Sequence, residues 1–79
     1  MIDYIPPTPE QVREFLRTHN LTGSAAAELA GLNSSAAVRK YTGGAQPHRV
    51  SYAVWFAWHA KMILAPSQIA EIEEAMKNS

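Results

Sequence analysis

The chain has 79 residues, and its 7 Lys and Arg balance 7 Asp and Glu, so its formal net charge is zero. This length predicts one domain, covering residues 1–79, with a core close to the smallest that holds a fold without covalent staples. The absence of cysteine excludes disulfides and thiolate metal sites. The first ten residues lack the features of a secretory signal, and the longest apolar run, 52–58, is too short to span a bilayer. We therefore expect a cytoplasmic protein that does not contact membranes.

The neutral total hides an uneven distribution of charge. Residues 33–61 carry four Lys or Arg and no Asp or Glu. Residues 1–32 carry two basic and four acidic residues, and residues 62–79 carry one basic and three acidic residues. DNA-binding domains are usually basic overall, which counts against DNA as a partner. A basic middle between two acidic ends counts in favour of DNA as a partner. The alternative is that so few charges are clustered by chance.

The chain begins with an expected extended arm over residues 1–7, which contains a Pro-Pro pair. Thr8 and Gln11 then form a capping-box pattern with a proline at the first helical position. We expect a helix over 9–19, ended near Asn20. Its apolar stripe at helical spacing is formed by Val12, Phe15 and Leu16.

Two short helices joined by a glycine are expected next, the order of a helix-turn-helix. The first starts after Thr22 or Gly23, is rich in alanine and ends near Ala30. Gly31 suits a left-handed position at its C-terminal end. The second opens at Asn33 or Ser34 as N-cap. It carries Val38 and Tyr41 inward and ends at Gly43–Gly44.

The chain resembles the lambda-repressor/Cro-like (Xre-type) helix-turn-helix family over residues 10–64. The resemblance is carried by the stretch GSAAAELAGLNSSAAVRKYTGG, a following proline and an aromatic-rich helix. Within the family it looks most like small repressors of phages and mobile elements, including those found beside anti-CRISPR genes. The family's small, glycine, hydrophobic, aromatic and proline positions would fall here on Ala27, Gly31, Val38, Tyr41, Gly44 and Pro47. This implies an all-α, compact five-helix bundle that contains a helix-turn-helix.

One spacing departs from the family pattern. The interval from Gly31 to Val38 is one residue longer than usual. Either the turn is longer by one residue, or Ala37 takes the anchoring place and the residues after it rotate. The two alternatives assign different residues to the reading of bases.

The resemblance implies that the third helix enters the major groove of DNA. The base-contact candidates are Asn33, Ser34, Ser35, Ala36 and Arg39, of which the arginine is best suited to guanine. The phosphate-contact candidates are Thr22, Gly23, Ser24, Lys40, His48 and Arg49. Several of these residues also have a purely structural interpretation: Asn33 and Ser34 would cap their own helix, and Arg39 and Lys40 would be ordinary solvated charges. Arg49 would instead pair with an acid of the C-terminal helix.

The segment 51–64 predicts a helix that is apolar nearly all round, with Ser51 as its N-cap. A domain this small cannot bury all of it. We expect Phe56 and Ile63 in the core and a tryptophan-bearing face at a two-fold interface, because tryptophan is a typical interface anchor. The interface candidates are Val54, Trp55, Trp58 and Met62. A central helix in a monomer is the alternative.

The last expected helix, within residues 66–79, carries Ile69, Ile72 and Met76 as its apolar stripe and three Glu outward. It either caps the core or completes a dimer. A dimer would read an inverted repeat with two recognition helices one DNA turn apart.

No residue pattern predicts an enzyme, a cofactor, a small-molecule ligand or a metal site, and the three histidines are scattered. We expect a sequence-specific transcriptional regulator, a homodimeric repressor or autorepressor whose partner is double-stranded DNA. The alternative is a protein-binding module or inhibitor on a helix-turn-helix scaffold, which docks a partner through its aromatic helix.

Overall fold

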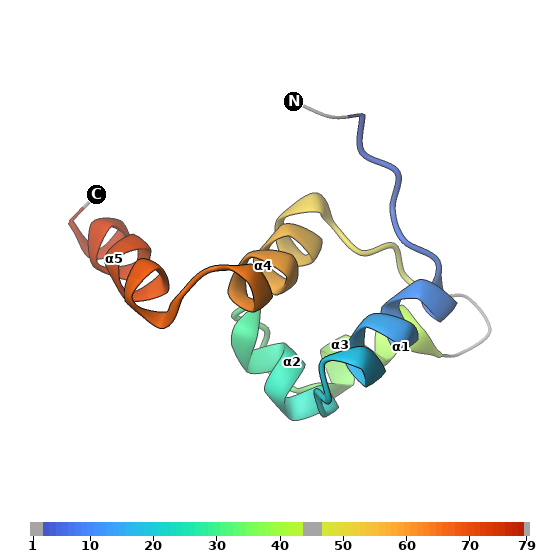
Figure 1. The fold of residues 1–79 in the computed structure, drawn as a ribbon. Coiled ribbons are helices and arrows are strands. Elements are labelled where there is room, and N and C mark those ends of the chain that lie inside the picture. The colour runs from blue at the N-terminus through green and yellow to red at the C-terminus, as the bar shows by residue number, and fades with distance from the viewer. Residues whose placement is uncertain (1–2, 44–46, 79) are drawn as a thin grey trace.

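The chain folds into helices joined by short connections. The computed structural model describes residues 3–43 and 47–78, and within these ranges it contains five helices and no strand. In chain order the helices are α1 (Pro9–Thr18), α2 (Gly23–Leu29), α3 (Ser35–Thr42), α4 (Tyr52–Ile63) and α5 (Pro66–Lys77). Helices α1 to α4 form one body, with α3 against both α1 and α2, and α5 projects from the end of α4 (Figure 1). The predicted all-α class is confirmed.

The first helix begins and ends as its sequence predicts. The Thr8 hydroxyl oxygen accepts from the Gln11 backbone N–H at 3.1 Å, and the Gln11 side chain accepts from the Thr8 N–H at 2.8 Å. This reciprocal capping box satisfies two N–H groups that the first turn leaves without helical partners. The helix ends at Thr18, and Asn20 adopts a left-handed φ of 54° that turns the chain away.

The connection from α2 to α3 depends on one glycine. Gly31 has a φ of 70°, the left-handed conformation that glycine adopts without a steric cost. The chain continues to Ser34, which precedes α3 but makes no capping bond with its side chain. In α3 the buried anchor is Val38, which is 2% exposed, whereas Ala37 is only half-buried. Of the two residues considered for the anchoring place, Val38 rather than Ala37 is therefore the one that is buried. Gly44, one of the two glycines expected to end α3, lies outside the described residues.

The centre of the core is Trp58 of α4, whose side chain is fully buried. Its indole N–H donates to the backbone carbonyl of Ala26 at 2.8 Å, which ties α4 to α2. The Phe15 ring of α1 stacks on the Trp58 indole with 6.2 Å between the ring centroids. The Tyr41 ring of α3 meets the same indole edge-on, also at 6.2 Å between centroids. All four helices of the body therefore meet at this one side chain.

The burial of the two faces of α4 is the reverse of what the sequence predicts. Phe56 and Ile63, expected in the core, are 59% and 78% exposed. Trp58, expected at a dimer interface, is buried in the core and is not available to a partner. The other interface candidates, Val54, Trp55 and Met62, are half-buried and pack against the same core. The reversal follows from size, because the alanine-rich α2 leaves room for an indole opposite Ala26.

The N-terminal arm is fixed to the start of α4. The Tyr4 hydroxyl donates to the Val50 carbonyl at 2.6 Å, and its ring meets that of Tyr52 edge-on at 5.4 Å. Burial raises the pKa of Tyr4, because desolvation disfavours the phenolate. The protonated Tyr4 hydroxyl therefore contributes to the free energy of unfolding at neutral pH, and this contribution is lost as the pH rises through the raised pKa.

We expect Trp58→Phe to lower the free energy of unfolding by about 2 kcal/mol, through the lost hydrogen bond to Ala26 and the space left in the core. Trp55→Phe is the matched control on the same helix. Its indole is half-buried, and we expect a loss below about 1 kcal/mol. Urea denaturation measures both values. Equal losses would contradict the central place of Trp58.

Gly31→Ala should destabilise the protein by about 1 kcal/mol for conformational reasons alone. A methyl group at this position meets no atom within 4 Å, so the cost comes from the φ of 70°. Gly43→Ala is the control, because Gly43 has an ordinary extended φ of −145°. There the alanine should be neutral or stabilising by roughly 0.5 kcal/mol. Equal effects of the two changes in urea denaturation would contradict the role of Gly31.

Candidate functional site

The outer face of α3 is polar and basic because its inner face is fixed by Val38. The exposed residues at its start and along its outer side are Asn33, Ser34, Ala36, Arg39 and Lys40. The Arg39 guanidinium donates to the Ser35 hydroxyl oxygen at 3.3 Å, one turn earlier on the same helix. This bond directs the arginine along α3 towards its N-terminal end.

The start of α2 lies against the start of α3. A Cβ on Gly23 would lie 3.2 Å from the Cβ of Ser35, so the two first turns approach as closely as a glycine permits. The neighbouring Thr22 hydroxyl caps α2 by accepting from the Ala25 N–H at 3.1 Å. Ser24 is exposed. Two of the predicted contact residues, Gly23 of α2 and Ser35 of α3, are therefore adjacent in space, and Ser35 is half-buried.

A second group of predicted cations gathers at the other end of α3. The His48 backbone N–H donates to the Lys40 carbonyl at 2.7 Å, which brings the segment that precedes α4 back to the end of α3. The side chains of Lys40, His48 and Arg49 are exposed. The surface formed by these three residues, Arg39 and Arg13 is called the basic face below.

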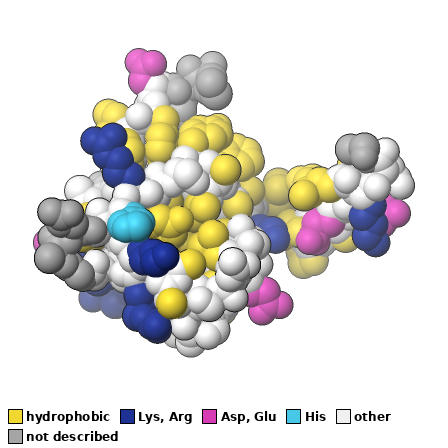
Figure 2. Space-filling view, turned by 180° about the vertical axis from the view of Figure 1, so that it is seen from behind, with side chains coloured by type: hydrophobic (Ala, Val, Ile, Leu, Met, Phe, Trp, Pro, Cys, Tyr) yellow, Lys and Arg dark blue, Asp and Glu magenta, His cyan; other side chains and the backbone are white. Residues whose placement is uncertain are grey.

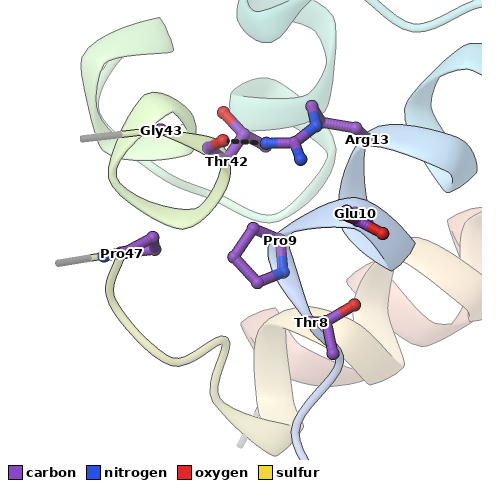
Figure 3. A pocket seen from close by; sticks show the side chains of 7 residues that line it. All are labelled: Thr8, Pro9, Glu10, Arg13, Thr42, Gly43 and Pro47. Carbon is purple, nitrogen blue, oxygen red and sulfur yellow. Dashed lines mark hydrogen bonds between the residues drawn. The ribbon is translucent and has the colours of Figure 1, made fainter. Parts of the chain in front are cut away.

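Arg13 was not among the residues predicted from the sequence. Its guanidinium donates to the backbone carbonyl of Thr42, the last residue of α3 (Figure 3). The two residues are linked across a hollow of about 510 Å³ between the first turn of α1 and the end of α3. The hollow is lined by Thr8, Pro9, Glu10, Arg13, Thr42, Gly43 and Pro47. No local sequence signal marks Arg13, because only the packing of α1 on α3 brings it to this surface.

The charges of the basic face have no acidic partners among the residues that the structure describes. The ion pairs there are Arg17 with Glu14 on α1 and Lys77 with Glu74 on α5, and the second has an N–O distance of 3.5 Å. The expected alternative, a pair between Arg49 and a glutamate of α5, is not formed. Glu10 is the one acid that lines the hollow beside Arg13. Lys and Arg side chains gather around a histidine on one side of the body (Figure 2).

Exposed apolar surface is concentrated between α4 and α5. A groove of about 750 Å³ lies there, bounded by the outer face of α4, the end of α2 and the apolar stripe of α5. Its large apolar lining residues are Leu29, Phe56, Ile63, Leu64, Ile69, Ile72 and Met76. It is called the α4–α5 groove below.

Two of the histidines take part in aromatic packing. The rings of His19 and His59 lie 4.5 and 4.6 Å from the ring of Phe15, and both are exposed to solvent. Across residues 3–43 and 47–78, no cluster of three or more His, Cys, Asp or Glu is placed to hold a metal ion. Over the same ranges, each helix is too short or too polar to cross a membrane.

Comparison with protein-family models, with curated proteins and with solved structures finds no match for this chain. Its function must therefore be argued from the two surfaces just described.

Proposed function

We propose that this protein is a sequence-specific DNA-binding transcriptional regulator that uses α2 and α3 as a helix-turn-helix. The observation that carries the proposal is the outer face of α3. It presents short polar side chains at its start, towards which the Arg39 guanidinium is directed, and at its end it presents cations without acidic partners among the described residues. Such a surface suits DNA, whose backbone is negatively charged and whose groove edges carry hydrogen-bonding groups.

The connection between the two helices supports this assignment. Helix α2 is short, ends before a left-handed glycine, and lies against the first turn of α3 through Gly23 and Ser35. A recognition helix needs such a support so that its N-terminal end projects into the major groove. The resemblance of the sequence to the lambda-repressor/Cro-like family gives the same assignment.

In the proposed complex the two ends of α3 have different tasks. Its first turns enter the major groove, where Asn33, Ser34 and Ser35 contact base edges or nearby phosphates and Ala36 can contact a thymine methyl. Arg39 reads guanine through its O6 and N7 atoms. The rest of the basic face binds phosphates, which sets the position of the protein without reading sequence.

We further propose that the protein acts as a homodimeric repressor that recognises an inverted repeat. A single short recognition helix contacts few base pairs, and two-fold symmetry doubles the site that is read. Regulation of its own promoter is the simplest biological role for such a dimer.

A second candidate function is supported by the exposed apolar side of α4. Tyr52 and Phe56 are 39% and 59% exposed, and their rings stack at 5.7 Å between centroids. A protein-binding module that docks a partner through this helix would need no basic face. Measurements of DNA binding distinguish the two candidates.

The affinity for random duplex DNA should fall steeply with salt concentration. A plot of the logarithm of the association constant against the logarithm of the salt concentration should have a slope of roughly −0.9 for each phosphate neutralised. Lys40→Ala should make this slope shallower by about 1, because it removes one phosphate contact. Lys77→Ala is the matched control, since Lys77 is also exposed in the last turn of a helix but lies on α5. Fluorescence anisotropy at several salt concentrations measures the slopes. Absent binding at low salt, or equal slopes for both variants, would contradict the DNA-binding proposal.

Arg39→Ala should remove the preference for guanine at one position of each half-site, a discrimination of about 1–3 kcal/mol. Arg49→Ala should instead weaken all sequences alike. Selection from randomised duplexes, followed by affinity measurements, separates the two effects. Arg17→Ala, which removes a cation already paired with Glu14, is the control and should change neither quantity. The same loss of preference in both the Arg39 and the Arg49 variant would contradict the division of tasks.

A further inference from the structure

The α4–α5 groove is the strongest feature of the molecule that DNA binding leaves unexplained. Helix α5 projects from the end of α4 (Figure 1), and the groove of about 750 Å³ lies between them. Phe56 and Ile63 of α4 and Ile72 of α5 line it and are exposed to solvent. Exposed apolar surface of this extent on a small domain marks an interaction site. The volume lies within the range of small-molecule pockets, about 300–1,000 Å³.

The half-buried part of the groove lining is aliphatic, with a single exception. These half-buried lining residues are Leu29, Ala30, Ala57, Ala60, Leu64, Ile69 and Lys61. The lining therefore offers an aliphatic surface and, within it, one ammonium group. A ligand pocket of this kind takes an apolar body and uses its few polar groups to fix the orientation of the ligand.

The exception, Lys61, differs from the other charged residues of the chain. Among the residues that the structure describes, it is the one Lys, Arg, Asp or Glu that is half-buried rather than exposed. It follows Ala57 and precedes Leu64 by one helical turn, so the three share a face of α4. No ion pair joins it to a described residue. A partly desolvated ammonium without a counter-ion attracts an anion more strongly than a fully hydrated one does.

We propose that the groove binds a small amphiphilic anion, an aliphatic carboxylate of the fatty-acid type. Its chain lies along the half-buried aliphatic lining and covers the exposed Phe56 and Ile72. Its carboxylate accepts hydrogen bonds from the Lys61 ammonium. The site is separate from the proposed DNA-binding surface, because none of its lining residues belongs to the basic face.

Two glutamates of the groove oppose this head group, but from a different environment. Glu28 of α2 and Glu73 of α5 also line the groove, and both are exposed. Charges in contact with bulk water are screened by salt, so their repulsion of a carboxylate is weaker than the attraction of the half-buried Lys61. If the glutamates governed the groove, it would instead prefer a cationic head group on the same chain.

Isothermal titration calorimetry of the full chain with dodecanoate, below its micelle-forming concentration and without DNA, tests the proposal. We expect one dodecanoate to bind per chain. Dodecyltrimethylammonium has an equal chain and a cationic head group, and it should bind at least about tenfold more weakly. Acetate carries the head group without the chain and should give no measurable binding.

Lys61→Met keeps an unbranched apolar side chain and removes its charge, so the affinity for dodecanoate should fall about tenfold. Lys77→Met is the matched control, because Lys77 is an exposed helical lysine outside the groove lining, and it should leave the affinity unchanged. Glu73→Gln should leave the affinity equal or raise it, since it removes a repulsive charge.

Filling the groove tests its aliphatic lining. Ala60→Leu places a larger side chain among the half-buried lining residues and should abolish dodecanoate binding. Ala53→Leu is the control on the same helix, because Ala53 is exposed and does not line the groove. Circular dichroism checks that each variant keeps the helical content of the parent. If Ala60→Leu does not keep it, the comparison of Lys61→Met with Lys77→Met decides.

Several results would overturn the proposal. These are absent binding of dodecanoate, equal effects of Lys61→Met and Lys77→Met, tighter binding of dodecyltrimethylammonium, or a loss in Glu73→Gln as large as that in Lys61→Met. An apparent affinity for dodecanoate that falls as the protein concentration rises would also overturn it, because a second copy of the chain would then cover the groove. The salt dependence of DNA affinity is measured separately, so failure of either proposal leaves the other in place.

Discussion

The fold depends on one large side chain placed among small ones. Trp58 of α4 fills the space that the alanines of α2 leave open, and its indole N–H is satisfied by the carbonyl of Ala26. Buried tryptophan is stable only where this donor finds an acceptor, so the hydrogen bond fixes the position of α4 relative to α2. Phe15 and Tyr41 pack on the same indole, and α1 and α3 are thereby placed as well.

This placement determines which side of α3 faces solvent. With Val38 directed into the core, the polar start of the helix and its two cations are directed outward. Helix α1 then adds Arg13 to the end of α3, because the Arg13 guanidinium donates to the Thr42 carbonyl. The segment before α4 adds His48, whose backbone N–H donates to the Lys40 carbonyl. The basic face is thus assembled from three parts of the chain around one helix. Its lack of acidic partners reflects the acid-free stretch between Glu28 and Glu71.

The same constraint explains the exposed apolar groove. A body of four short helices can surround only one side of α4, and the indole of Trp58 occupies that side. The aromatic and aliphatic residues on the other side remain uncovered, next to a helix α5 whose stripe is also uncovered. One protein therefore presents a polar, basic surface and an apolar one.

The sequence by itself determined where three helices begin and how one ends: the N-caps Thr8, Thr22 and Ser51 and the left-handed Gly31 follow from local chemistry. The acid-free middle of the chain is also read directly from the sequence. It could not assign the faces of α4, since an apolar helix has no polar side to orient it. Nor could it choose between Ala37 and Val38, or bring Arg13 to the basic face. Those choices depend on how side chains from different helices fill a common volume, and only the tertiary structure decided them.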